Sequence, residues 1–200
     1  MKNKLLLLLS LLCLASCQPI MKAIYGIKKP DIENQESITK KALKFGLDTT
    51  NIVSVTSKDF PYILKSTSIP NAAIYDSKGK YIEYRQTDTS CNAGLFDFIP
   101  KLNVSGTYNK PDSSSLAEEW TKFRDLKGNE MSLPDNADFY LLIYWNVWTG
   151  KLNKDHVKIW EDLARENKNS KIKVIKVNLD IQEYWEPKEK EMYRKAMRKL

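Results

Sequence analysis

The sequence predicts a protein of the α/β class, because stretches with the pattern of strands alternate with stretches that have the pattern of helices. Residues 139–145 (FYLLIYW) form a continuous apolar run, which is typical of a strand that is buried on both faces of a sheet. The apolar runs at 71–75 and 80–84 flank a turn with glycine at its end, as expected for a β-hairpin. Together these features predict a central mixed sheet flanked by helices.

The first half of the chain is expected to hold, in order, a strand at 23–27, a helix at 37–45, a strand at 51–55, one or two helical turns at 60–65, the hairpin, and a helix at 93–102. Within the first helix, Ile38, Ala42 and Phe45 recur at the spacing of one helix face, and Gly46 is a natural end for it. The stretch NIVSV at 51–55 is rich in β-branched residues, as strands are.

The second half is expected to hold, in order, a helix at 116–123, a small hairpin at 123–133 that turns at 127–129, the strand at 139–145, a helix at 155–166, a strand at 172–179, and a charged helix at 183–200. The strand at 172–179 alternates apolar and polar residues, and Pro187 suits the first turn of the last helix. Residues 103–115 are rich in Ser, Asn, Gly and Pro, which predicts a linker between the two halves.

The N-terminus has the layout of a secretory signal. Two lysines precede an apolar run at 5–14, broken only by Ser10, and small residues follow it. A membrane span needs about 20 apolar residues, so cleavage is favoured over the alternative of an uncleaved anchor. Residues 14–17 (LASC) resemble the lipobox of bacterial lipoproteins, which implies removal of residues 1–16, lipidation of Cys17 and a tether at 17–22. By analogy, Gln18 implies delivery to the outer membrane, facing the periplasm.

Charge and cysteine content exclude several classes of function. Removal of the signal leaves 30 basic residues against 25 acidic ones, and the two kinds are interleaved along the chain. This pattern predicts a solvated surface and no nucleic-acid partner. Of three cysteines, only Cys91 remains for other chemistry, so no disulfide forms within the mature chain. His156 is the only histidine and has no ligand spacing around it, so we expect no metal and no cofactor.

Residues 144–152 (YWNVWTGKL) are similar to the active-site segment of thioredoxin-like proteins, in which W-C-G-P-C follows an apolar strand and opens a helix. Trp148 and Gly150 match that segment, Thr149 and Leu152 stand where its cysteines belong, and Lys151 replaces its proline. The resemblance covers about 121–186, with the spacing of membrane-anchored thiol–disulfide oxidoreductases. It implies a thioredoxin-like fold.

The chemistry of that family needs a thiolate at the helix start and a second thiol three positions on. Thr149 has no nearby base to activate its hydroxyl, and Leu152 carries no sulfur. The acidic residue often found in the preceding strand is also absent, because Ile143 falls near its position. We therefore expect a scaffold without dithiol chemistry. The alternative is that the tryptophans of this region are ordinary core aromatics of an α/β protein.

Pro70, which precedes the hairpin, resembles the cis-proline that faces the active site in thioredoxins, although an ordinary trans turn proline is equally compatible with the sequence. Two architectures follow. In the first, which is slightly favoured, residues 23–102 form one thioredoxin-like lobe and residues 116–200 form a second, partial lobe in close contact with it. In the second, the halves pool their strands into one sheet, as in a permuted domain.

These features lead to two functional hypotheses. The favoured one is a membrane-anchored, exported lipoprotein with a redox-inactive scaffold that binds a protein or peptide through the former active-site groove. The alternative is a redox accessory or enzyme that uses the single thiol of Cys91, which precedes the helix expected at 93–102.

Overall fold

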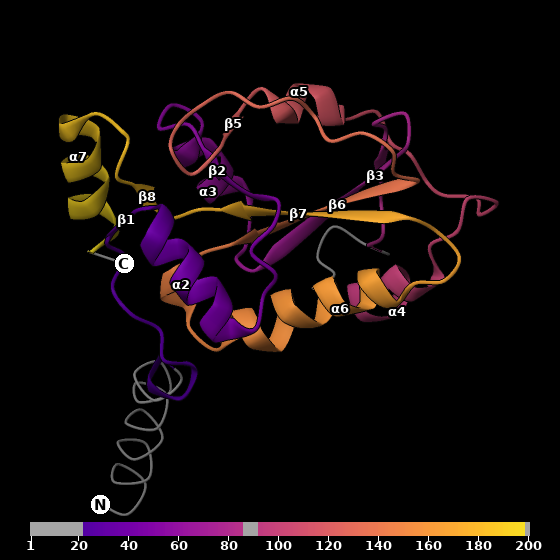
Figure 1. Ribbon diagram of the computed structural model, residues 1–200, viewed down its shortest axis with the longest axis horizontal. Helices are drawn as coiled ribbons and strands as arrows, with labels where there is room; N and C mark the ends of the chain where they lie inside the picture. Colours follow the sequence, from indigo (N-terminus) through magenta and orange to yellow (C-terminus); the bar gives the residue numbers. More distant parts are fainter. Residues whose placement is uncertain (1–21, 86–91, 199–200) are drawn as a thin grey trace, which may run out of the picture.

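Six strands form one mixed sheet at the centre of the protein (Figure 1). The structure, a computed structural model, describes residues 22–85 and 92–198. The strands lie in the order β4-β3-β6-β7-β2-β5. Their bounds are β2 (Ile52–Val55), β3 (Asn71–Asp76), β4 (Tyr81–Ile82), β5 (Phe123–Arg124), β6 (Phe139–Trp145) and β7 (Ile172–Asn178).

Strands from the two halves of the chain are interleaved in this sheet, because β6 and β7 lie between β3 and β2. The central strand β6 pairs in parallel with β7 and antiparallel with β3, and β7 pairs in parallel with β2. The hairpin of β3 and β4 closes one edge, and β5 closes the other edge by pairing antiparallel with β2. The slightly favoured division into two lobes is therefore wrong, since neither half has a sheet of its own. The halves pool their strands, as the second architecture required.

Helices cover both faces of the sheet (Figure 1). They are α2 (Gln35–Phe45), α3 (Phe60–Ser66), α4 (Gly94–Phe98), α5 (Leu116–Trp120), α6 (Lys158–Glu166) and α7 (Pro187–Met197). Short 3-10 turns lie at Ile99–Lys101 and Val147–Thr149, and a π-helical turn at Asn153–Val157 leads into α6. Two further short strands, β1 (Ile32–Glu33) and β8 (Ile181–Gln182), pair in parallel beside the main sheet.

The apolar run of β6 is continuous because each face of the strand meets a separate core. Leu141, Ile143 and Trp145 pack with α2 and α6 on one face. The intervening residues, among them Leu142 and Tyr144, pack with α3 and α5 on the other. All seven residues of β6 are buried, as expected for a strand covered on both sides.

Several local expectations need correction. Residues 22–25 form one helical turn where a strand was expected at 23–27. Residues 123–133 do not form a hairpin, because their strand β5 pairs with β2 instead. A turn is present within them, closed by a hydrogen bond from the amide of Asp125 to the carbonyl of Asn129. The helix expected at 93–102 changes at Ile99 to a 3-10 turn that contains Pro100.

The segment 103–115 is not a spacer between lobes. Tyr108 packs edge-on against Phe139 of β6, with ring centroids 5.7 Å apart, and Lys110 forms an ion pair of 2.6 Å with Asp76 at the end of β3. The amide of Glu83 also donates to the carbonyl of Asn109. This segment therefore lies along the β3–β4 edge and covers it. Among the residues that the structure describes, no helix combines the length and the apolar character needed to cross a bilayer.

Candidate functional site

Pro70 and Leu152, which are far apart in the sequence, line the same groove, with a volume of about 580 Å³. Pro70 lies just before β3, where Asn71 pairs with Tyr144 near the end of β6. The peptide bond between Ile69 and Pro70 is cis, which is one of the two isomers that the sequence left open. The groove therefore lies where β6 leaves the sheet and the following helical turns begin.

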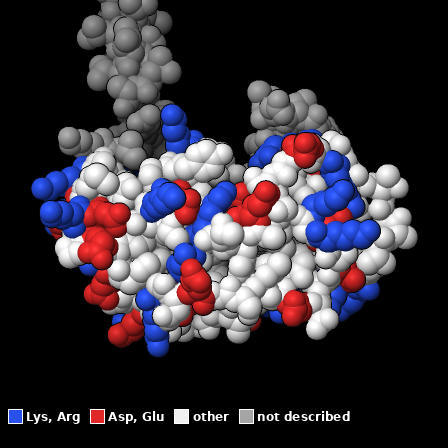
Figure 2. All heavy atoms as spheres, turned by 90° about the horizontal axis from the view of Figure 1, so that it is seen from above, with Lys and Arg blue, Asp and Glu red and all other residues white. Residues whose placement is uncertain are grey.

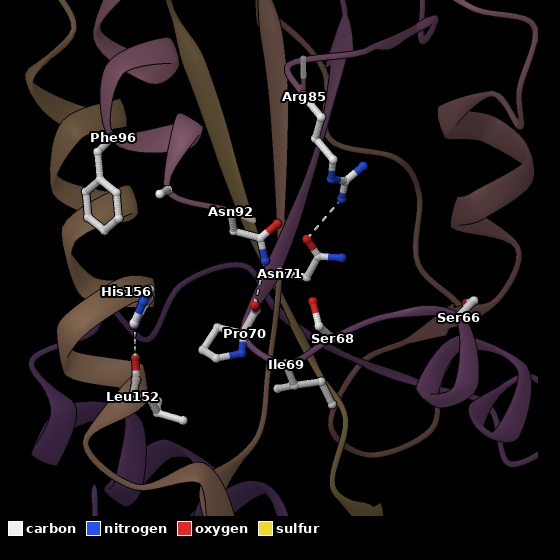
Figure 3. Close-up of a pocket in the computed structure, with 11 residues that line it drawn as sticks. Ser66, Ser68, Ile69, Pro70, Asn71, Arg85, Asn92, Phe96, Leu152 and His156 are labelled. Carbon is white, nitrogen blue, oxygen red and sulfur yellow. Dashed lines mark hydrogen bonds between the residues drawn. The ribbon is translucent and has the colours of Figure 1, made fainter. Parts of the chain in front are cut away.

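We call this cavity the Pro70 groove, and Figure 3 shows the side chains around it. Its lining residues come from the end of α3, the loop before β3, the segments on either side of residues 86–91, and the turns before α6. They are Ser66, Ser68, Ile69, Pro70, Asn71, Arg85, Asn92, Ala93, Phe96, Leu152 and His156.

A set of hydrogen bonds fixes one wall of the Pro70 groove. Asn92 Nδ2 donates to the carbonyl oxygen of Pro70 at 2.9 Å, and the Tyr84 hydroxyl donates to Asn92 Oδ1 at 2.7 Å. Arg85 lies over the Tyr84 ring, 4.8 Å from its centroid, and donates to Asn71 Oδ1 at 3.3 Å. Burial raises the pKa of Tyr84 to about 12, against the opposing effect of Arg85. Tyr84 thus remains a neutral donor that holds Asn92 in place.

The opposite wall is aromatic. His156 Nδ1 lies 3.3 Å from the carbonyl oxygen of Leu152, one turn earlier. The rings of His156, Phe96 and Trp160 pack against one another, with His156 at centroid distances of 6.1 Å from Phe96 and 5.7 Å from Trp160. One wall of the Pro70 groove therefore carries polar side chains, with amide and guanidinium groups, and the other carries aromatic side chains. Binding sites for ligands commonly combine a few polar groups with apolar surface in this way.

The loop before β3, which contributes to the lining of the Pro70 groove, contains backbone groups without a partner among the described residues. Within the described part of the chain, neither Ser68 nor Ile69 has a backbone hydrogen-bond partner. Both residues line the groove, and Ser68 is exposed. Backbone groups of this kind can be satisfied by an extended peptide that lies alongside them.

The segment that resembles a thioredoxin active site is structural in its first part. Thr149 is buried: its amide donates to Asn146 Oδ1 at 3.0 Å and its hydroxyl to the Asn146 carbonyl at 3.1 Å. These bonds close the turn after β6 and occupy the hydroxyl as a donor. Trp148 is partly buried and packs on the core beside α3, and Lys151 is exposed. Only Leu152 of this segment lines the Pro70 groove.

Gly150 faces the N-terminal turn and not the groove. Lys151 N–H donates to the carbonyl of Tyr25 at 2.7 Å, and Lys28 N–H donates to the carbonyl of Trp148 at 2.9 Å. An added Cβ at Gly150, where φ is +62°, would lie 2.3 Å from the Tyr25 carbonyl oxygen. Residues 22–28 therefore pack directly on the turn that resembles the family's reactive segment.

A buried polar layer lies behind this turn. Asp180 Oδ2 accepts from the amide of Val147 and from Asn178 Nδ2, each at 2.8 Å, while its Oδ1 has no partner among the described residues. Gln182 Nε2 donates to Asn178 Oδ1 at 2.8 Å. Burial is the main cause that raises the pKa of Asp180 to about 7. The carboxyl group fixes the start of the turn through Val147, at the end of β6.

No family model, curated protein or solved structure matches this chain.

Residues 22–85 and 92–198 contain no group of three His, Cys, Asp or Glu side chains arranged to hold a metal ion. Cys17, the expected lipidation site, and Cys91, the candidate reactive thiol, lie outside the described residues, as do the expected signal at 1–16 and most of the tether. The next residue after Cys91, Asn92, does line the Pro70 groove.

Sequence reasoning located Pro70 and Leu152 and considered His156 without placing it beside them, but it missed the roles of other residues around them. Asn71, Arg85 and Asn92 carry no motif, because their roles come from contacts between strand ends. Asp180 and its polar neighbours could have been suspected from one signal, the alternation of polar and apolar residues at 178–182 (NLDIQ), at the end of a strand expected in the core. That signal alone does not separate a buried layer from a surface turn.

Proposed function

We propose that this protein is an exported lipoprotein, held on a bacterial membrane through Cys17, whose thioredoxin-like scaffold binds a protein or peptide partner in the Pro70 groove without dithiol chemistry. The observation that carries the proposal is that Pro70 and Leu152 line one groove beside the unpaired backbone of Ser68 and Ile69. Thr149 and Leu152 offer no sulfur for electron exchange. A groove of this kind retains the means to bind an extended chain after the redox chemistry is lost.

The arrangement of strands supports the thioredoxin-like part of the proposal. The resemblance needs a strand before the active-site segment, a parallel neighbour, and a proline-bearing hairpin on the other side. Strands β6, β7 and the β3–β4 hairpin supply these parts as neighbours in the sheet. The hairpin precedes β6 in the chain, so the proposed scaffold is a permuted one.

Photo-cross-linking in cells tests partner binding. A photoreactive residue, p-benzoylphenylalanine, placed at Ser68 should yield a discrete adduct with the partner. The same residue at Val104, which is 69% exposed on the loop after α4, is the matched control and should yield none. Leu152→Asp should lower the yield at Ser68 about tenfold, because it removes one apolar contact worth roughly 1.5 kcal/mol or more. Equal adducts at positions 68 and 104 would contradict the proposal.

The membrane part of the proposal has its own test. The mature N-terminal peptide should begin at Cys17 and carry the mass of attached acyl chains. Cys17→Ser should abolish that modification and leave the chain uncut before residue 17. An N-terminal peptide without acyl mass, beginning at another residue, would refute the lipid anchor while leaving the groove proposal open to its separate test.

The second candidate function is a redox accessory that acts through Cys91. The observation in its favour is that Asn92 and Ala93, the two residues after Cys91, line the Pro70 groove. An alkylation-rate titration measures the pKa of the thiol: a value well below the usual 8.5 favours this function, whereas an inert thiol excludes it. Reduction of insulin disulfides that persists after Cys91→Ser would contradict both candidates.

A further inference from the structure

The two segments that meet at Gly150 carry lysines and no acidic residues. Residues 22–30 contain three lysines and residues 148–154 contain two, with no Asp or Glu in either stretch. Over the whole chain, by contrast, 25 acidic residues accompany 32 basic ones. Figure 2 shows that balance on one face of the molecule, where Lys and Arg side chains are interspersed with Asp and Glu.

Backbone hydrogen bonds hold these two segments together. The amide of Lys28 donates to the carbonyl of Trp148 and the amide of Lys151 donates to the carbonyl of Tyr25, so the two lysine-bearing segments lie side by side. Figure 1 shows the N-terminal segment at the same end of the molecule as the turns that lead into α6. We call Lys28, Lys29, Lys151 and Lys154 the lysine patch.

The lysine patch is exposed and forms no ion pair with a described residue, and the exposed Asp31 and Asp155 directly follow the two stretches that carry it. All four side chains belong to exposed residues, and none forms an ion pair with any residue that the structure describes. Ile24 lies in the helical turn at 22–25, next to Tyr25, whose carbonyl accepts from the amide of Lys151, and it is 53% exposed. An exposed apolar side chain among unpaired lysines suits the interface of a membrane, where the apolar group enters the headgroup region and the lysines meet lipid phosphates.

We propose that the lysine patch and Ile24 dock on a membrane surface that contains anionic phospholipid. The inference rests on the proposed lipid anchor only for its location, since the described part of the chain begins at residue 22, five residues after Cys17, in the helical turn that holds Ile24. The acyl chains determine the affinity of the protein for the membrane, whereas the lysine patch determines which face of the protein lies against the lipid. One anchor plus a basic surface is a stronger combination than either alone.

The test is hydroxyl-radical footprinting of the full chain, reconstituted in vesicles of neutral phosphatidylcholine or in vesicles that also contain phosphatidylglycerol. Oxidation of Ile24 should be about fivefold slower on the anionic vesicles, and about 1 M salt should remove the difference by screening. Val104, which is 69% exposed on a different loop, is the internal control and should react equally on both.

Two variants with equal loss of charge complete the test. Lys28→Gln, Lys29→Gln, Lys151→Gln and Lys154→Gln together should abolish the protection of Ile24. The matched variant replaces the exposed Lys40, Lys44, Lys65 and Lys168 with Gln and should retain it. Equal oxidation of Ile24 on both kinds of vesicle, or protection that survives loss of the patch, would overturn the inference. Release of the chain from neutral vesicles would count against the lipid anchor, while the comparison with anionic vesicles still judges the patch.

Discussion

Lys176 and Glu161 form an ion pair inside the protein, between β7 and α6. Lys176 Nζ lies 2.6 Å from Glu161 Oε1, and the two side chains are 2% and 5% exposed. Glu161 Oε2 also accepts from the amide of Asp48 at 3.0 Å, so the carboxylate ties the loop after α2 to the same point. Burial makes each charge dependent on the other, since an isolated charge in the interior is costly.

We expect Glu161→Ala to lower the free energy of unfolding by about 3–5 kcal/mol, because it leaves the Lys176 ammonium buried without a partner. The double variant Glu161→Leu with Lys176→Met should recover most of that loss. Glu130→Ala is the control: it breaks the exposed pair with Arg124 and should cost less than about 1 kcal/mol. Urea denaturation measures all three, and a cost for Glu161→Ala as small as that of the control would contradict the prediction.

Asp180 is the second residue whose burial has a measurable consequence. An unfolded aspartate has a pKa of about 3.9, whereas burial raises the pKa of Asp180 to about 7 in the folded protein. Between these values the folded state binds more protons than the unfolded state. The contribution of Asp180 to stability therefore falls as the pH rises from about 4 to about 7.

We predict that Asp180→Asn removes this pH dependence while it preserves an acceptor for the amide of Val147. Relative to the unmodified protein, the variant should gain about 2–3 kcal/mol in free energy of unfolding between pH 5 and pH 8. Asp155→Asn, which removes an exposed carboxylate near the start of α6, controls for the loss of one negative charge. Denaturation curves at the two pH values provide the measurement, and parallel profiles for the Asp180 variant and the unmodified protein would refute it.

Among the elements, the N-terminal turn at 22–25 depends on one glycine of a different segment. Gly150 and Gly26 both have a positive φ, +62° and +63°. An added Cβ at Gly26 would meet nothing within 4 Å, whereas at Gly150 it would collide with the carbonyl oxygens of Tyr25 and Gly26. An alanine at position 26 therefore introduces backbone strain alone, whereas an alanine at position 150 introduces backbone strain and a steric clash.

We expect Gly26→Ala to cost about 1–2 kcal/mol from backbone strain alone. Gly150→Ala should cost more than that, because the N-terminal turn must also move away from the turn after β6. Thermal unfolding measures the difference, and limited proteolysis near residues 22–29 shows whether the turn is released. Equal costs and equal proteolysis in the two variants would show that the contact contributes nothing.

Elements with a strong local pattern were predicted well. The seven apolar residues of β6 predict a strand covered on both faces, and Gly46 ends α2 with a φ of +79°, as expected. The strand expected at 23–27 is wrong because apolar residues in a short run do not distinguish a strand from one helical turn. The segment 103–115 was predicted to be a linker because most of its residues are small or polar. The prediction overlooked its one aromatic residue, Tyr108, whose ring packs against Phe98 and Phe139.

At the scale of the whole molecule, the order of strands was the hardest property to predict. Ile52 pairs with Lys176 and Asn71 pairs with Tyr144. The local sequence pattern of a strand does not indicate which distant strand it will pair with. The candidate site shares this limit. Pro70 and Leu152 carried a resemblance, whereas Arg85 and Asn92 reach the groove only because the strand order brings their loops to it.

The pooled sheet predicts that neither half of the chain folds alone. Fragments divided after Pro111, on the loop before α5, should each lack a cooperative thermal transition, because β6 and β7 would lose β3 and β2 as neighbours. Mixing the fragments should restore a transition, since all six strands are then present. Circular dichroism during heating measures both states, with the intact chain as control. A sharp transition in the isolated N-terminal fragment would reveal an autonomous lobe.

The pairing of β2 with β7 also determines how early during synthesis or export the sheet can fold. During synthesis or export, β2 emerges early, yet its parallel neighbour becomes available only after residue 178 has appeared. Until then one edge of β2 is unpaired and can form hydrogen bonds with a strand of another chain, which leads to aggregation. The main sheet can therefore be completed only after β7 has appeared, and a holding chaperone that covers residues 52–55 until then would suit this order of assembly.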